Sequence, residues 1–240
     1  MNATAKMTGL PALTIDFLKA SGVLIDNVFA SLWRDIGMKT LLSRSGFAKR
    51  SGAPMHDVIY GLMLWVWLKK ESIGLFAREC QQAALGKDVL YDTLNREDLN
   101  WRKLHEQIAY KTIQMFKSPG KKAYVVDDSI KQRFGKKIPG ISSHFDYTSG
   151  RHRMGQQVLT LGLSCDEGFV PLDSELFINQ TKAIDLHEPF EDGRSIAAKR
   201  YRTVQQWSKP EMANAMVKRA LNAGIMLTIQ WLTPGLAPRR

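Results

Sequence analysis

Two adjacent carboxylates, Asp127 and Asp128, close a short β-branched run in the segment AYVVDDS, and these residues are the best suited to chemistry. Carboxylate oxygens are the ligands that Mg²⁺ prefers, and the ion keeps several waters when it binds them. Two such ions about 4 Å apart can stabilise both the attacking and the leaving oxygen of a phosphoryl transfer. The pattern therefore predicts a metal-binding acid at the C-terminal end of a strand.

Only one of the two acids is expected to meet a metal, because successive side chains of a strand point to opposite faces. The other acid fits an Asx-type turn that stops the strand, since Asp often ends a strand in this way. The residue pattern alone leaves open which of the two has which role.

Basic residues are in clear excess, with 34 Lys and Arg against 23 Asp and Glu in 240 residues and a net charge of +11. Such an excess favours a polyanionic partner, most often nucleic acid, over a protein that is merely basic. For Arg151 and Arg153, a solvated turn before the second strand is the competing interpretation. We expect the DNA-contacting residues to be Lys131, Arg133, Lys136, Lys137, Arg151, Arg153, Lys199, Arg200 and Arg202.

The pattern of apolar residues changes at the segment SPGKK, residues 118–122, which is predicted to be a linker. Before it, from about residue 13 to 116, apolar residues recur at helical spacing. Within this region the segments 72–85 and 88–96 fit a helix-turn-helix, and a tight corner between two helices fits them equally well. After the linker, the sequence predicts strands at 123–129, 156–165 and 169–177, a hairpin turn at 166–168, and a helix at 209–224.

Other candidate sites have weaker support. Cys80 and Cys165 lack metal-ligand spacing, which favours a reduced intracellular protein, and His144 and His152 match no strong metal pattern. The apolar run 58–68 is too short to cross a bilayer, so we expect a buried helix there. The N-terminus shows no signal peptide, and a cytoplasmic chain is expected. Asp146 is interpreted as structural, and the hairpin acids Asp166, Asp173 and Glu175 are not assigned a catalytic role.

The block VVDDSIKQRFGKK, followed by SSHFDYTSGRHRMGQQVLTLGLSCDEGFVPLDSELF, resembles the first part of the catalytic domain of bacterial insertion-sequence transposases of the DDE type. The segment GKDVLYDTLNREDLNWRKL, residues 86–104, is similar to the helical region of these proteins. The resemblance implies an α/β fold, in which a helical N-terminal domain over residues 1–118 that could bind DNA precedes an incomplete RNase H-like catalytic domain over residues 119–240.

The same resemblance implies functional roles for individual residues. Asp127, followed by Ser129, matches the family's Asp-x-Ser/Thr motif, which makes Asp127 the catalytic residue and the ligand of Mg²⁺ or Mn²⁺, with Asp128 as the alternative ligand. The expected partner is double-stranded DNA at transposon terminal inverted repeats. A homodimer or a heterodimer with full-length transposase, and a location on the bacterial nucleoid, are further expectations.

The second Asp and the Glu of this family are not found, because residues 225–240, IMLTIQWLTPGLAPRR, contain no acid. One hypothesis is a changed reading frame, since shifted codons after Ile225 can encode Ala-Asp-Ser/Thr-Trp with the Asp codon spanning Leu232 and Thr233. Programmed frameshifting is the other explanation. We therefore predict a truncated transposase that is inactive alone. The alternative is a DNA-binding fragment that occupies transposon ends or inhibits full-length transposase.

Overall fold

The structure is a computed structural model that describes residues 26–50, 52–68, 71–79, 85–117, 120–135, 138–146, 149–179, 181–183, 188–226 and 229–230. It separates into two compact units, Met1–Asn100 and Trp101–Arg240. Several features expected from the sequence lie outside the described residues: the first helical segment over residues 13–22, Cys80, Lys136, Lys137 and the last ten residues.

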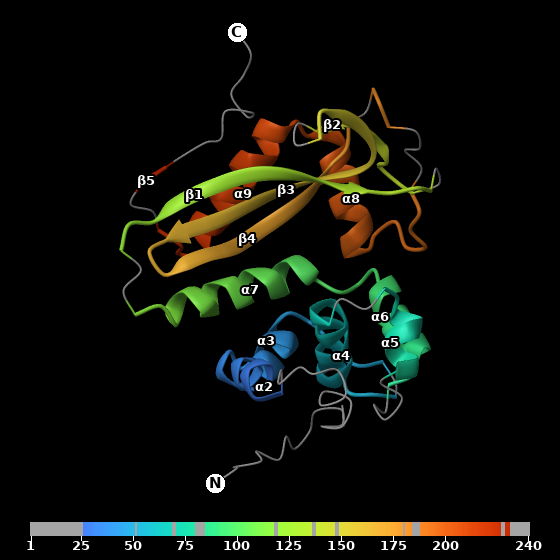
Figure 1. Cartoon of the computed structure of the whole chain (residues 1–240), viewed down its shortest axis with the longest axis vertical. Helices are drawn as coiled ribbons and strands as arrows, with labels where there is room; N and C mark the ends of the chain where they lie inside the picture. The colour runs from blue at the N-terminus through green and yellow to red at the C-terminus, as the bar shows by residue number, and fades with distance from the viewer. Residues whose placement is uncertain are drawn as a thin grey trace. The chain divides into compact units, whose positions relative to one another are not determined.

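The first unit is helical, as the spacing of its apolar residues predicts. The ring of Trp33 lies edge-on to that of Tyr60, with centroids 5.0 Å apart, and both side chains are buried. The apolar run that begins at Val58 forms a helix, although Val66 and Trp67 at its end are exposed. The helices of this unit, shown in Figure 1, are α2 (Asp26–Asp35), α3 (Met38–Arg44), α4 (Met55–Trp67), α5 (Ile73–Glu79) and α6 (Lys87–Asn95).

In the part that the structure describes, the second unit combines a sheet with three helices, and this confirms the α/β fold. The described strands lie in the order β2-β3-β1-β5, and β4 also pairs with β3. Strand β1 is antiparallel to β3 and parallel to β5. The elements are α7 (Trp101–Gln114), β1 (Ala123–Gln132), β2 (Ser142–Asp146), β3 (Arg151–Cys165), β4 (Gly168–Phe177), α8 (Ile196–Gln206), α9 (Lys209–Asn222) and β5 (Ile229–Gln230).

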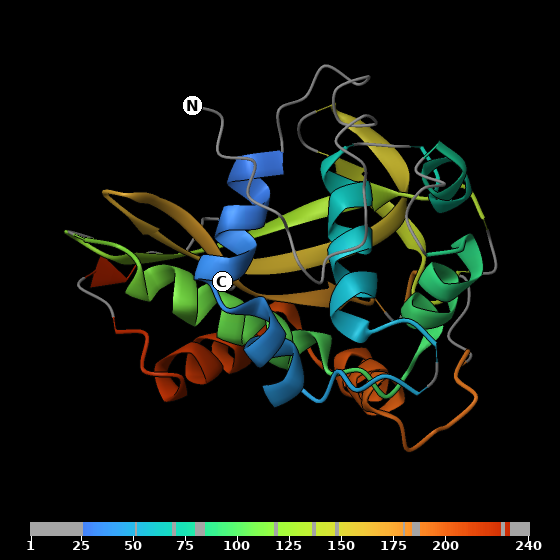
Figure 2. The ribbon, with the colours of Figure 1, turned by 90° about the horizontal axis from the view of Figure 1, so that it is seen from below.

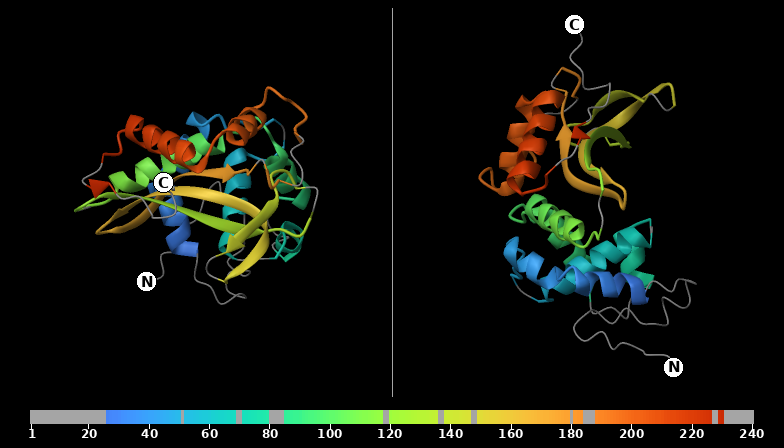
Figure 3. Two further views of the ribbon diagram at one scale, coloured as in Figure 1. Left: turned by 90° about the horizontal axis from the view of Figure 1, so that it is seen from above. Right: turned by 90° about the vertical axis from the view of Figure 1, so that its left-hand side faces the viewer.

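The core of this unit lies between one face of the sheet and the three helices (Figures 2 and 3). Tyr124 and Val126 of β1 alternate with outward-facing neighbours, so their side chains point into this core. The Tyr124 hydroxyl donates a hydrogen bond of 2.6 Å to the carbonyl of Ile225, which follows α9. This bond holds the end of the α9 segment next to β1, and burial raises the pKa of the Tyr124 phenol.

The predicted hairpin is confirmed, whereas two strand limits are wrong. Strand β1 does not end at the two acids but continues to Gln132, because the ladder with β3 extends to the Gln132–Gly155 pair. Strand β3 begins at Arg151, so Arg151 and Arg153 lie in the strand and not in a turn before it. The extra strand β2, which the sequence did not indicate, pairs with this first part of β3.

Helices α7 and α8 also differ from the sequence-based expectation. Helix α8 was not predicted, and its N-terminus is capped by Ser195, whose Oγ accepts a hydrogen bond of 3.1 Å from the Ala198 amide. Helix α7 precedes the predicted linker, but its residue Ala109 packs in the core of the second unit. The compact unit therefore begins at Trp101, and the functional domain limits at residues 118 and 119 stay a prediction.

Candidate metal and nucleic-acid site

Asp127 and Asp128 lie side by side in the middle of β1 and are both exposed. Asp127 is paired across the ladder with Thr160, and Asp128 with Leu159. Leu159 is fully buried in the core, so Asp128 lies on the helix-covered face and Asp127 on the opposite face. The expectation that the two acids point in opposite directions follows directly from this register.

Asp128 is held by an ion pair to Lys209 at the start of α9. The Lys209 Nζ atom lies 2.5 Å from Oδ2 of Asp128 and 5.0 Å from the centroid of the Phe177 ring. Because Lys209 also makes this cation–π contact, the three side chains connect β1, β4 and α9. Asp128 therefore has a structural partner, and a metal ion at this carboxylate would have to compete with an ammonium group.

His144 is a second polar side chain near this ion pair, on the strand β2. Its Nε2 atom lies 2.8 Å from the Ser142 hydroxyl, and the residue is buried. Burial is the main cause that lowers the His144 pKa, and the positive charge of Lys209 lowers it further. An uncharged imidazole is consequently the favoured form at neutral pH, and its hydrogen bond to Ser142 is a sufficient structural role.

Asp127 is available to a ligand. Its side chain makes no hydrogen bond or ion pair with any residue that the structure describes. Ser129 and Lys131 follow it on the same face of β1 and are exposed as well. Asp127 thus lies on an accessible polar face, and the basic side chain of Lys131 lies four residues further along the same face.

The described residues do not form a complete metal site. No group of three or more His, Cys, Asp or Glu side chains within the described ranges could hold a metal ion. One free carboxylate cannot supply the oxygen ligands that two Mg²⁺ ions need. The residues present therefore do not fit the two-metal centre by themselves.

A buried ion network lies on the helix-covered face, and the sequence did not predict it. Two carboxylates of β4, Asp173 and Glu175, are buried beneath three guanidinium groups. Arg219 Nε donates to Asp173 Oδ2 at 2.7 Å, and Arg200 Nε donates to Glu175 Oε2 at 3.0 Å. Arg102 of α7 contacts both acids. The network joins β4 to all three helices of the unit.

Burial disfavours the charged form of two arginines in this network, Arg102 and Arg200. Burial lowers the Arg102 pKa to about 10, and the positive charges of Arg200 and Arg219 add to the effect. Three positive charges face two negative charges, and the carboxylates accept hydrogen bonds from Arg200 and Arg219 and offset the buried charge of Arg102. Asp173 and Glu175, to which the sequence assigned no catalytic role, therefore hold the helices against the sheet.

The network removes Arg200 from the predicted DNA-contacting set, because its guanidinium is bound to Glu175 and to the Ser174 carbonyl. Its neighbour Arg202 forms an exposed ion pair of 3.0 Å with Glu188. Lys199, on the same helix, is exposed. The three basic residues of α8 therefore do not form one free surface.

Four other basic residues of the predicted set lie at one end of the β1–β3 ladder, beyond the two acids. Lys131 pairs with Gln156 across the β1–β3 ladder, and the Arg133 amide donates a hydrogen bond of 3.1 Å to the Met154 carbonyl. Arg151 and Arg153 precede Met154 in β3, where Arg153 forms an ion pair of 2.9 Å with Asp146. We call Lys131, Arg133, Arg151 and Arg153 the basic end of the sheet. All four are exposed.

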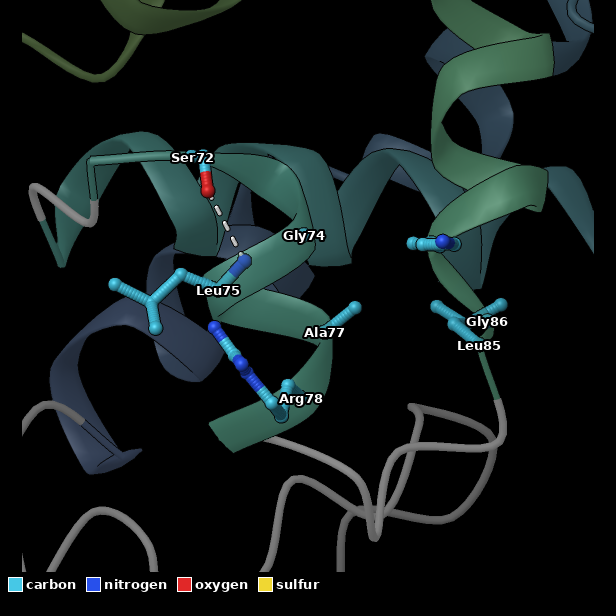
Figure 4. A pocket seen from close by; sticks show the side chains of 8 residues that line it. Ser72, Gly74, Leu75, Ala77, Arg78, Leu85 and Gly86 are labelled. Carbon is cyan, nitrogen blue, oxygen red and sulfur yellow. Dashed lines mark hydrogen bonds between the residues drawn. The ribbon is translucent and has the colours of Figure 1, made fainter.

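The helical unit has a cavity of its own between α5 and α6, of about 560 Å³ (Figure 4). At its rim the Ser72 hydroxyl accepts a hydrogen bond of 3.1 Å from the Leu75 amide. Arg78 and Lys87 line the cavity and are exposed. Helices α5 and α6 confirm two short helices in this region, and the choice between a helix-turn-helix and a simple corner stays open.

A family model described as "DDE superfamily endonuclease" matches residues 68–231, which is more than half of the chain. No curated protein and no solved structure matches this chain.

Proposed function

This chain belongs to the DDE superfamily endonucleases, and from this premise we propose that it is an insertion-sequence transposase, with Asp127 as the first acid of its metal centre. The observation that carries the proposal is the accessible carboxylate of Asp127 in the middle of β1, between β3 and β5 in the sheet. Asp128 is the alternative ligand, but its ion pair with Lys209 favours Asp127.

The parallel strand β5 supports this assignment. Ile229 pairs with Ala123, and Gln230 pairs with Tyr124. In a chain that continued this register, a carboxylate three or four positions after Ile229 would be level with Val126 or Asp127. The shifted frame would place its Asp codon at this distance, across Leu232 and Thr233. Reading the gene beyond the codon of Gly224 tests the hypothesis, which fails if no frame encodes this Asp and a later Glu.

We expect the purified 240-residue chain to show no Mg²⁺-dependent cleavage or strand transfer. The physical reason is that Asp127 alone cannot hold two metal ions. The measurement is the release and joining of labelled ends from a duplex that carries the terminal inverted repeat. Robust activity would contradict this prediction, and the variants Asp127→Asn and Asp128→Asn would then show which of the two acids it requires.

A second candidate function is DNA binding without cleavage, and the basic end of the sheet favours it. A chain that binds transposon ends without cutting them could exclude an active transposase or pair with it as a heterodimer. Lys131 and Arg133 are exposed at the end of β1. Their charges are suited to phosphate contacts, which position a protein on DNA and make its affinity depend on salt.

Replacing Lys131 or Arg133 by glutamine is expected to weaken duplex binding without changing sequence preference. Each lost phosphate contact should reduce the slope of log K against log salt concentration by about 1. Fluorescence anisotropy between low and moderate salt measures both quantities. Lys218→Gln is the matched control, because Lys218 is exposed on α9 away from the basic end. Equal slopes for all variants would argue against this surface.

The sequence preference and the location of the chain are also proposals. We propose terminal inverted repeats as the specific target, and a gel-shift comparison with unrelated DNA tests it. Association with the bacterial nucleoid would follow from DNA binding. Among the described residues, no helix is long and apolar enough to span a membrane.

A further inference from the structure

Phe134 has the most exposed large apolar side chain of the described residues, with 88% of its surface accessible. Single exposed apolar residues are common on protein surfaces, so exposure alone has no functional meaning. What distinguishes Phe134 is its position directly after Arg133 and three residues after Lys131. An accessible aromatic ring is thus attached to the basic end of the sheet.

The backbone before Phe134 is fixed. The Arg133 amide donates to Met154, and the Arg133 Nε atom donates to the Gln156 side chain at 3.3 Å. Both bonds attach the residue before Phe134 to β3. The ring is therefore presented from a strand end that is held in the sheet, and this protein backbone loses little entropy when a ligand binds.

A second aromatic contact lies at the same end of the sheet. Phe145 of β2 pairs with His152 of β3 in the ladder, and their rings meet edge to face with centroids 5.3 Å apart. Phe145 is 42% exposed. Since His152 lies two residues before Met154, both aromatic groups flank the part of β3 that carries Arg151 and Arg153.

Exposed aromatic rings between cations match the chemistry of unpaired nucleotides. Phosphates attract the basic side chains, and every base has a π-face that can stack on an aromatic ring whatever its sequence. A regular duplex buries its base faces and offers only phosphates and groove edges. The Phe134 ring therefore finds no exposed base face to stack on in a regular duplex.

We propose that Phe134 stacks on an unpaired base of the DNA, while Lys131 and Arg133 contact the neighbouring phosphates. The proposal rests on the DNA-binding function proposed above and specifies the form of DNA that this surface selects. The base can come from single-stranded DNA or from a locally opened duplex. Both sources present the same chemistry, and the experiment separates them.

The test uses the full 240-residue chain and three labelled DNAs of the same sequence: a single strand, a blunt duplex, and a duplex with one unpaired central base. That base is the fluorescent analogue 2-aminopurine. Phe134→Leu keeps an apolar side chain but removes the aromatic ring, and Phe134→Trp keeps a ring. Phe169→Leu is the matched control, because Phe169 is a second exposed aromatic residue at the opposite end of β3.

We expect Phe134→Leu to lose roughly 5- to 100-fold in affinity for DNA with an unpaired base, as measured for stacked bases elsewhere. Its affinity for the blunt duplex should stay unchanged. Phe134→Trp should restore binding and the quenching of 2-aminopurine, and Phe169→Leu should resemble the original chain. A loss confined to the single strand, or to the opened duplex, identifies the source of the base and supports stacking.

Two results would overturn the inference while leaving the proposed function intact. In the first, Phe134→Leu binds all three DNAs as tightly as the original chain. In the second, it loses affinity for all three equally, which would mean that the ring does not contact a base. If the original chain binds none of the DNAs even at low salt, the DNA-binding function itself fails. If the surface around Phe134 binds an acidic protein and not DNA, the chain would likewise bind none of the three DNAs.

Discussion

Replacing Glu175 by alanine is expected to lower the free energy of unfolding by about 3 kcal/mol. The carboxylate of Glu175 is almost fully buried and contacts the guanidinium groups of Arg102, Arg200 and Arg219. Its removal leaves these three charges with Asp173 as the remaining acid of the network. Two-state urea unfolding of the variant and the original chain measures the difference.

The exposed pair of Glu188 and Arg202 provides the matched control for this prediction. Their side-chain atoms lie 3.0 Å apart, close to the distance between Glu175 and Arg200, but both side chains are more than one third exposed. Exposed ion pairs contribute roughly 0–1 kcal/mol, so Glu188→Ala should have a small effect. If the two variants lose equal stability, burial of the network is not what makes Glu175 important.

Replacing Gly155 by alanine is expected to cost about 2 kcal/mol, because a side chain does not fit at this point of the sheet. A Cβ atom on Gly155 would lie 2.4 Å from the backbone oxygen of Lys131 and 3.1 Å from the Cα atom of Gln132. Both obstacles are backbone atoms, so the strands β1 and β3 must separate. The same displacement should weaken DNA binding, since Lys131 belongs to the basic end of the sheet.

Gly74→Ala is the control for this effect, because it adds the same methyl group in open space. The nearest atom to its Cβ would be the Ser72 hydroxyl at 4.0 Å, and Gly74 lies in α5, where alanine is favoured over glycine. Thermal unfolding followed by circular dichroism should show a lower midpoint for Gly155→Ala alone. A midpoint that stays the same would show that the β1–β3 crossing can relax at little cost.

The sequence was sufficient to predict the family and most elements of the second unit. The order of the motifs around Asp127 indicated a DDE protein, and the model match over residues 68–231 confirms this. The hairpin at residues 166–168 and the helix α9 were predicted because turn residues, a Pro at a helix start and a Gly at a helix end are local signals.

The strand limits were wrong because they depend on pairing. Asp-Asp-Ser is typical of a strand end, yet the partner strand β3 extends the ladder as far as Gln132. The strand β2 was missed for the same reason, since its five residues have weak propensity and are ordered by pairing with β3. Local composition does not contain this information.

The ion network was only partly predictable. Asp173 and Glu175 are two residues apart in a predicted strand, so the sequence places both on one face. Their partners come from three helices that are distant in the chain, and α8 was not predicted at all. Arg200 was therefore assigned to DNA, although the fold commits it to Glu175. Exposed and buried arginines cannot be told apart without tertiary structure.

Asp127 and Asp128 point to opposite faces of the sheet, so natural selection acts on these two neighbouring residues for different reasons. Asp128 is paired with Lys209, so substitutions there remove a contact between β1 and α9. Asp127 has no partner among the described side chains, so substitutions there remove no described contact and act first on what the surface binds. A lineage that abandons cleavage can therefore lose the first residue freely while it retains the second.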